Sequence, residues 1–197
     1  MATSTLNPKV VLLAVGLALS GVGAVASDYQ PYPNTSPGTV YRWKTYVVDD
    51  HGGKKLRGIY IDTIEGKTLI GDHEYVVVKR VNPENRPLSP IIYRCDNQLF
   101  GILLAPSERA LLVHWKGSPS EGQTWTNGTQ KIVTRGQADV EVEGAAYRDC
   151  WVLDQFDNGQ LVNRSYFNRD EGWVESVRYT NGRVSVITIR LPEGIDQ

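Results

Sequence analysis

The chain has 197 residues, which is long enough for one domain with a buried core. Apolar residues make up 41% and charged residues 22% of it, a balance that excludes wholesale disorder. The formal net charge is −1 and basic residues are interspersed with acids, so the chain lacks the basic stripe that nucleic-acid binding needs. We therefore expect a globular protein with no nucleic-acid partner.

Residues 1–26 differ from everything after them. Lys9 is their only charge, and residues 10–19 form an almost unbroken apolar run. Such a run is about half as long as the roughly 20 residues that a membrane-spanning helix requires. Residues 24–26, Ala-Val-Ala, are small residues of the kind that signal peptidase accepts. The pattern predicts a signal peptide cleaved near Ala26, an exported mature protein and no stable transmembrane segment after cleavage.

Residues 27–38 form a proline-rich segment that contains Pro31, Pro33 and Pro37. Proline has no backbone N–H and a fixed φ, which disfavours both helix and central strand. We expect an extended lead-in over residues 27–38, followed by a single antiparallel β domain over residues 39–197.

From residue 39 onward, short β-rich runs alternate with turn sequences, and no window of 12 residues carries an apolar helical stripe. In the first run, Tyr41 and Trp43 alternate with Arg42 and Lys44, as expected of a half-buried strand. In chain order, strands are predicted over residues 39–48, 56–64, 74–81, 91–95, 100–104, 111–115, 131–134, 140–143, 147–155, 161–168, 173–179 and 184–191.

Two turn sequences predict hairpins in the second half. Asn158-Gly159 and Asn181-Gly182 each separate two β-rich runs, and Asn-Gly favours tight hairpins because both residues tolerate positive φ. The last four strands should therefore be sequential antiparallel neighbours. Eleven or twelve strands in one domain also exclude a flat sheet, because sheets that wide curl or split. The predicted fold is all-β with little helix: a strongly curved antiparallel sheet arranged as a half-barrel, a barrel or a sandwich.

Two segments of the second half carry a resemblance to a known group of proteins. Residues 144–153 combine a Gly-led turn, an aromatic residue and a Cys that starts an apolar strand, and residues 163–174 combine a Tyr-Phe pair with a Gly-Trp-Val strand start. Together with Gly38 and Trp43 near the opening, this resembles exported bacterial β-rich domains of unknown function, which are distantly similar to the half-barrels of periplasmic lipoprotein carriers. The resemblance implies a curved sheet able to hold acyl chains, a periplasmic or secreted location and no catalytic residue.

Cys95 and Cys150 are the only cysteines of the chain. An exported chain meets an oxidising compartment, in which a close pair of thiols normally forms a disulfide. The sequence does not place the two Cα atoms within the roughly 7 Å that a disulfide requires. A Cys95–Cys150 disulfide and two free thiols are therefore both open, and Cys95 lies outside the segments that carry the resemblance.

The chemistry-bearing residues predict neither catalysis nor a metal site. His51 and His73 lie beside acids, but their spacing matches no ligand motif, and no Gly-x-Ser-x-Gly sequence is present. Asp149 and Trp151 flank Cys150 and would raise the pKa of its thiol, which disfavours a nucleophile. We expect no catalytic residue, no bound metal and no cofactor.

Aromatic residues are the candidate ligand-binding residues. Tyr41, Trp43, Trp151 and Trp173 occur in predicted strands, and a concave sheet lined with them could hold a hydrophobic or cell-envelope ligand. Alternatively they form the core, where strands commonly place Tyr and Trp. The sequence favours a non-catalytic exported protein that binds a lipid or another envelope component. The other hypotheses are an envelope structural or protein-interaction module that binds another envelope protein and, less favoured, a hydrolase.

Overall fold

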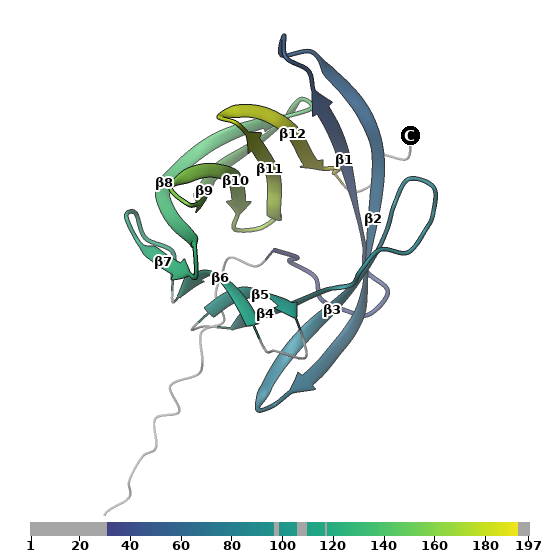
Figure 1. Cartoon of the computed structure of the whole chain (residues 1–197). Coiled ribbons are helices and arrows are strands. Elements are labelled where there is room, and N and C mark those ends of the chain that lie inside the picture. Colours follow the sequence, from purple (N-terminus) through teal and green to yellow (C-terminus); the bar gives the residue numbers. More distant parts are fainter. Residues whose placement is uncertain (1–30, 97–98, 106–109, 117, 193–197) are drawn as a thin grey trace, which may run out of the picture.

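The computed structural model describes residues 31–96, 99–105, 110–116 and 118–192. These residues form twelve strands and no helix (Figure 1). No helix in this part of the chain is therefore long and apolar enough to span a membrane. The predicted all-β class is confirmed, and the predicted signal peptide, residues 1–26, lies outside the described residues. The strands are β1 (Val40–Val48), β2 (Lys54–Ile70), β3 (His73–Val81), β4 (Ile91–Asp96), β5 (Leu99–Ala105), β6 (Ala110–Lys116), β7 (Thr124–Asn127), β8 (Gln130–Val142), β9 (Ala145–Asp157), β10 (Gln160–Asn168), β11 (Gly172–Thr180) and β12 (Arg183–Arg190).

All twelve strands belong to one antiparallel sheet, in the order β6-β5-β4-β3-β2-β1-β12-β11-β10-β9-β8-β7. Two meanders thus meet where β1 pairs with β12. The sheet bends until its edge strands approach each other, and the Asn127 side-chain amide on β7 donates to the carbonyl of Val113 on β6 at 3.3 Å. Because no backbone ladder joins β6 to β7 within the described residues, the sheet is an open, strongly curved half-barrel.

The second half confirms the predicted hairpins. Asn158 and Gly159 have φ values of 48° and 79°, and Asn181 and Gly182 have values of 51° and 75°. Strands β9 to β12 are therefore sequential antiparallel neighbours, as expected. Two details of the prediction were wrong: the runs 131–134 and 140–143 form one continuous strand, β8, and the short strand β7 was not predicted.

The concave face of the sheet holds the main hydrophobic core, which is rich in aromatic residues. Ring centroids lie 5.9 Å apart for Trp43 and Trp173 and 5.7 Å apart for Phe100 and Phe167. Tyr32, from the proline-rich lead-in, is only 1% exposed and packs into the same core. The lead-in therefore contributes to the core in addition to preceding the first strand.

A smaller core, which includes Val174 and Ile187, lies on the convex face. Val174 follows Trp173 directly, and successive side chains of a strand point to opposite faces. The β8–β9 hairpin reaches this face, because Glu143 at its turn accepts hydrogen bonds from Lys44 Nζ at 2.7 Å and from the Tyr46 hydroxyl. The hairpin thus covers part of the outer surface of β1 and reinforces the curvature of the sheet.

Cys95 and Cys150 are both free thiols, so the disulfide that the sequence left open is not formed. On β9, Trp151 and Leu153 contact the concave core, and alternation places Cys150 on the opposite face of the sheet. Cys95 packs against the concave core from β4. The two thiols therefore lie on different faces, which accounts for the absence of a bond between them.

Candidate functional site

The structure brings the four candidate aromatic residues together. Tyr41 and Trp43 are buried, with 3% and 2% of their surface exposed, and Trp151 and Trp173 are partly buried against the same concave core. Trp43 and Trp173 also line two adjoining pockets, whereas Tyr41 and Trp151 line neither of them. The geometry thus gives all four a part in the core, and their part in ligand binding stays a prediction.

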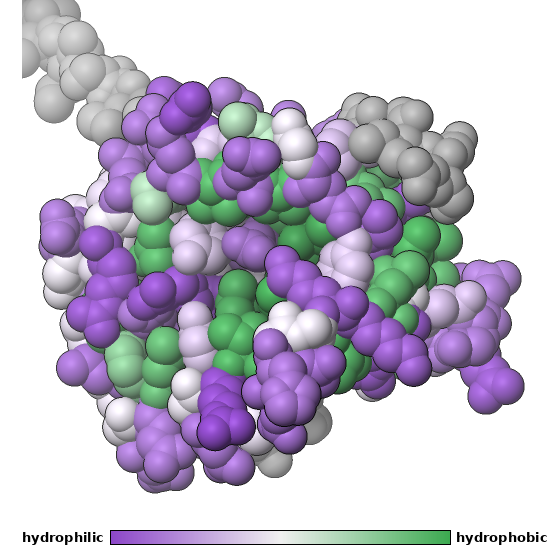
Figure 2. Space-filling view, turned by 90° about the horizontal axis from the view of Figure 1, so that it is seen from above, coloured by the Kyte–Doolittle hydropathy of each residue, from purple (hydrophilic) through white to green (hydrophobic). Residues whose placement is uncertain are grey.

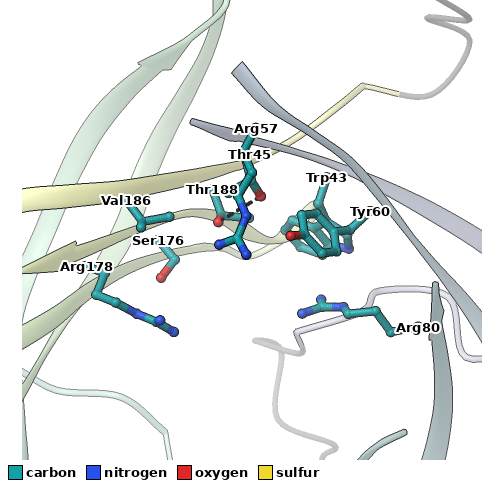
Figure 3. Close-up of a pocket in the computed structure, with 9 residues that line it drawn as sticks. All are labelled: Trp43, Thr45, Arg57, Tyr60, Arg80, Ser176, Arg178, Val186 and Thr188. Carbon is teal, nitrogen blue, oxygen red and sulfur yellow. Dashed lines mark hydrogen bonds between the residues drawn. The ribbon is translucent and has the colours of Figure 1, made fainter. Parts of the chain in front are cut away.

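The first pocket, called here the arginine pocket, has a volume of about 160 Å³. Its charged lining residues are Arg57, Arg80 and Arg178, and no acid or histidine among the described residues lines it. Figure 3 shows the three guanidinium groups pointing into the pocket from β2, β3 and β11. The pocket is therefore electropositive, although the chain as a whole has a net charge of −1.

Arg80 is fixed by a buried carboxylate, that of Asp62, which does not itself line the pocket. Asp62 has no exposed surface and accepts hydrogen bonds from Arg80 Nε and Nη2, both at 2.6 Å. The Tyr32 hydroxyl donates to the same carboxylate at 2.7 Å. Burial alone would lower the pKa of Arg80, but the bonds to Asp62 outweigh it and raise that pKa. Burial and the Asp62 charge raise the pKa of the Tyr32 hydroxyl, so Tyr32 stays neutral and keeps donating.

Arg57 and Arg178 differ from Arg80, because neither side chain forms a hydrogen bond or ion pair with a described residue. A β-bulge positions Arg57: Thr45 pairs with Gly58 and Tyr46 pairs with Leu56, which leaves Arg57 as the extra residue of β2. Bulges commonly redirect a side chain in this way. The bulge requires glycine, because Gly58 has φ of 150° and a Cβ there would lie 2.2 Å from Cγ of Pro83.

Polar groups complete the wall between the arginines. The hydroxyls of Thr45 and Thr188 lie 3.2 Å apart, and the Ser176 hydroxyl donates to the Asn163 side-chain carbonyl at 2.8 Å. The indole N–H of Trp43 is buried and has no acceptor among the described residues. A buried donor without a partner is uncommon in folded proteins. The wall thus combines hydroxyl groups, which both donate and accept, with a buried indole N–H.

The second pocket, called here the Trp173 pocket, has a volume of about 300 Å³. It shares Ser176 and Arg178 with the arginine pocket, so the two pockets adjoin, and together they are called the groove here. Ile102, Trp173 and Tyr179 give the Trp173 pocket apolar and aromatic surface. The groove therefore has a cationic end and a more apolar end.

The described residues contain no group of three or more potential metal ligands. Burial raises the pKa of the Cys150 thiol to about 11, so this thiol is protonated and unreactive at neutral pH. Arginine, serine and threonine line the arginine pocket without a neighbouring base that could activate a hydroxyl. The guanidinium and hydroxyl groups that line the arginine pocket are groups that can form hydrogen bonds to a ligand.

Sequence reasoning missed the three arginines. One signal was available for Arg80, which continues the alternating series of Val76 and Val78 and so faces the concave side.

Seen from above, the surface shows apolar areas separated by hydrophilic side chains (Figure 2).

No protein-family model matches the chain, and no curated protein matches it. Among solved structures, a protein from Bacteroides fragilis assigned as exported, with a YmcC-like fold, is 12% identical, with a TM-score of 0.49 over 84% of this chain and 97% of its own. A protein from Parabacteroides distasonis assigned as a lipoprotein is also 12% identical, with a TM-score of 0.44 over the same shares of the two chains.

A domain from Vibrio parahaemolyticus assigned as an outer membrane lipoprotein-sorting protein is 8% identical, with a TM-score of 0.23 over 85% of this chain and 90% of its own. By their descriptions, these neighbours are an exported protein, a lipoprotein and a lipoprotein-sorting domain, which agrees with the exported proteins and lipoprotein carriers that the sequence resembles. Similarity at this level bears on neither the ligand nor the activity of the chain.

Proposed function

We propose that this chain is an exported, non-catalytic binding protein that holds an amphiphilic ligand of the cell envelope in its concave groove. One observation carries the proposal: the electropositive arginine pocket and the more apolar Trp173 pocket adjoin and share Ser176 and Arg178. An amphiphile divides in the same way, with a polar head and an apolar tail. Export, with cleavage near Ala26 and a periplasmic or secreted destination, rests on the pattern of residues 1–26.

The dimensions of the groove support a small ligand. Its two pockets, of about 160 and 300 Å³, together fall in the lower part of the range of volumes typical of small-molecule sites. Each methylene of a tail that leaves water for the Trp173 pocket contributes about 0.8 kcal/mol to binding. About five buried methylenes would therefore offset the lowest estimates of the entropy cost of association, about 4 kcal/mol.

Replacing Trp173 with Leu should weaken the binding of dodecyl maltoside by about tenfold, or about 1.4 kcal/mol. The reason is that Trp173 supplies aromatic contact surface to the apolar end of the groove. Isothermal titration calorimetry of the exported protein, below the critical micelle concentration, measures the change. The matched control is Trp125→Leu, since Trp125 is also partly buried against the concave core but lies on β7, outside both pockets.

Thermal melting should show that both variants are folded before the titrations are compared. Equal loss of affinity in the Trp125 and Trp173 variants would contradict a ligand seated at Trp173. Failure of every dodecyl amphiphile to bind the folded wild-type protein would contradict the proposed function and favour an envelope interaction module.

A further inference from the structure

We infer that the groove selects amphiphiles whose head group is a phosphate, and that Arg57 and Arg178 bind this phosphate. The inference rests on the proposed function and names the chemical class of the ligand. It starts from the charge of the arginine pocket. Asp62 balances Arg80, whereas no described acid balances Arg57 or Arg178, so two positive charges face the same small space.

The absence of acids from the lining is a local property of this pocket. The chain has 22 acidic and 21 basic residues, and described arginines elsewhere do pair with carboxylates, including Arg135 and Arg164 with Asp154. Two like charges that line one pocket repel each other, and a bound anion would relieve that repulsion. Arg57 and Arg178 therefore lack a negatively charged partner among the described residues, and an anionic ligand bound in the arginine pocket would supply one.

The donor geometry favours phosphate. A guanidinium presents its N–H groups as a planar fork that binds two oxygens of one anion, and a phosphate has enough terminal oxygens to receive two such forks from different directions. Figure 3 shows Arg57 and Arg178 approaching the pocket from different strands. The Asp62 carboxylate accepts hydrogen bonds from Nε and Nη2 of Arg80. Nη1 of Arg80 forms no hydrogen bond with that carboxylate.

The experiment compares head groups on one tail. Dodecyl phosphate, dodecyl maltoside and dodecyltrimethylammonium are titrated into the exported wild-type protein below their critical micelle concentrations, with inorganic phosphate as a fourth probe. We expect dodecyl phosphate to bind at least about tenfold more tightly than dodecyl maltoside, because charge-assisted hydrogen bonds are about twice as strong as neutral ones. Its affinity should fall as salt rises.

The variants Arg57→Gln and Arg178→Gln should each weaken dodecyl phosphate by about tenfold and dodecyl maltoside by a clearly smaller factor, because only the phosphate head loses a charge-assisted hydrogen bond. Both side chains are exposed and unpaired, so both variants should keep the melting temperature of the wild type. Arg183→Gln is the matched control, because Arg183 is 73% exposed and lines none of the described pockets. It should change neither affinity.

The outcomes separate this inference from the proposed function. The wild-type protein could bind dodecyl phosphate and dodecyl maltoside equally tightly while Trp173→Leu still weakens binding. That result would overturn phosphate selection and leave the groove as an amphiphile site. If inorganic phosphate binds, if the Arg57 and Arg178 variants weaken that binding, and if none of the dodecyl amphiphiles binds, the result would support the phosphate site and contradict the role of the tail. Unchanged dodecyl phosphate binding in both arginine variants would overturn the assignment of these residues.

Discussion

Replacing Arg80 with Met should lower the free energy of unfolding by about 3–5 kcal/mol, because it leaves a buried carboxylate without its charged partner. Asp62 has no exposed surface, and after the substitution the Tyr32 hydroxyl would be its remaining described side-chain donor. The Arg80 side chain is itself 27% exposed, so water can screen part of the loss and the lower end of this range applies. Urea denaturation followed by circular dichroism measures the change.

A surface ion pair provides the control for Arg80. Arg148 pairs with Asp139, but the two side chains are 72% and 54% exposed. Water screens both charges of such an exposed pair, so Arg148→Met should have a much smaller effect on the free energy of unfolding. The double variant Asp62→Asn and Arg80→Met should recover part of the loss, because it removes the unpaired charge. If Arg80→Met and Arg148→Met destabilise the protein equally, the Asp62–Arg80 pair does not support the fold.

Replacing Trp43 with Ala should also cost about 3–5 kcal/mol of unfolding free energy, the usual range for a large aromatic residue removed from a core. Trp43 is 2% exposed, and its ring contacts those of Trp173 and Tyr32 at centroid distances of 5.9 and 6.2 Å. The same denaturation measurement tests this, with Val47→Ala as the control on the same strand. Val47 is 43% exposed, so its truncation should change stability by about 0.5 kcal/mol or less.

This second experiment also decides between the two roles that the sequence left open for Trp43. A variant that loses stability as expected places Trp43 in the core. A variant of unchanged stability that loses ligand affinity would instead make Trp43 a lining residue whose main contact is the ligand. Tyr41, which is 3% exposed and lines neither pocket, should behave as a core residue in the same assay.

Local signals predicted most of the sheet. Alternation around Tyr41 and Trp43 identified β1, and the Asn-Gly turns identified the β9–β10 and β11–β12 hairpins with their pairing. Where local signals are weak, the prediction was wrong. The middle of β8 is polar and contains register shifts after Thr134 and Ala138, so one strand looks like two. Strand β7 has only four residues, too few to show a period.

The candidate site depends on features that no local pattern carries. Asp62 and Arg80 meet because β2 and β3 pair in one particular register, and Arg57 faces the groove because of a bulge at Gly58. Arg178 joins them because the curvature of the sheet brings β11 opposite β3, as the shared pocket shows. The sequence identified the aromatic residues as a group. Which of them lie in the core and which line a pocket depends on the curvature of the sheet.

The most direct test of the central claim, that the groove holds an anionic amphiphile, is native mass spectrometry of the protein purified without detergent from its natural compartment. We expect a mass excess that disappears on denaturation and belongs to a released molecule with an acyl chain and a phosphate group. A folded protein whose mass equals that of the bare mature chain in every charge state would contradict the claim.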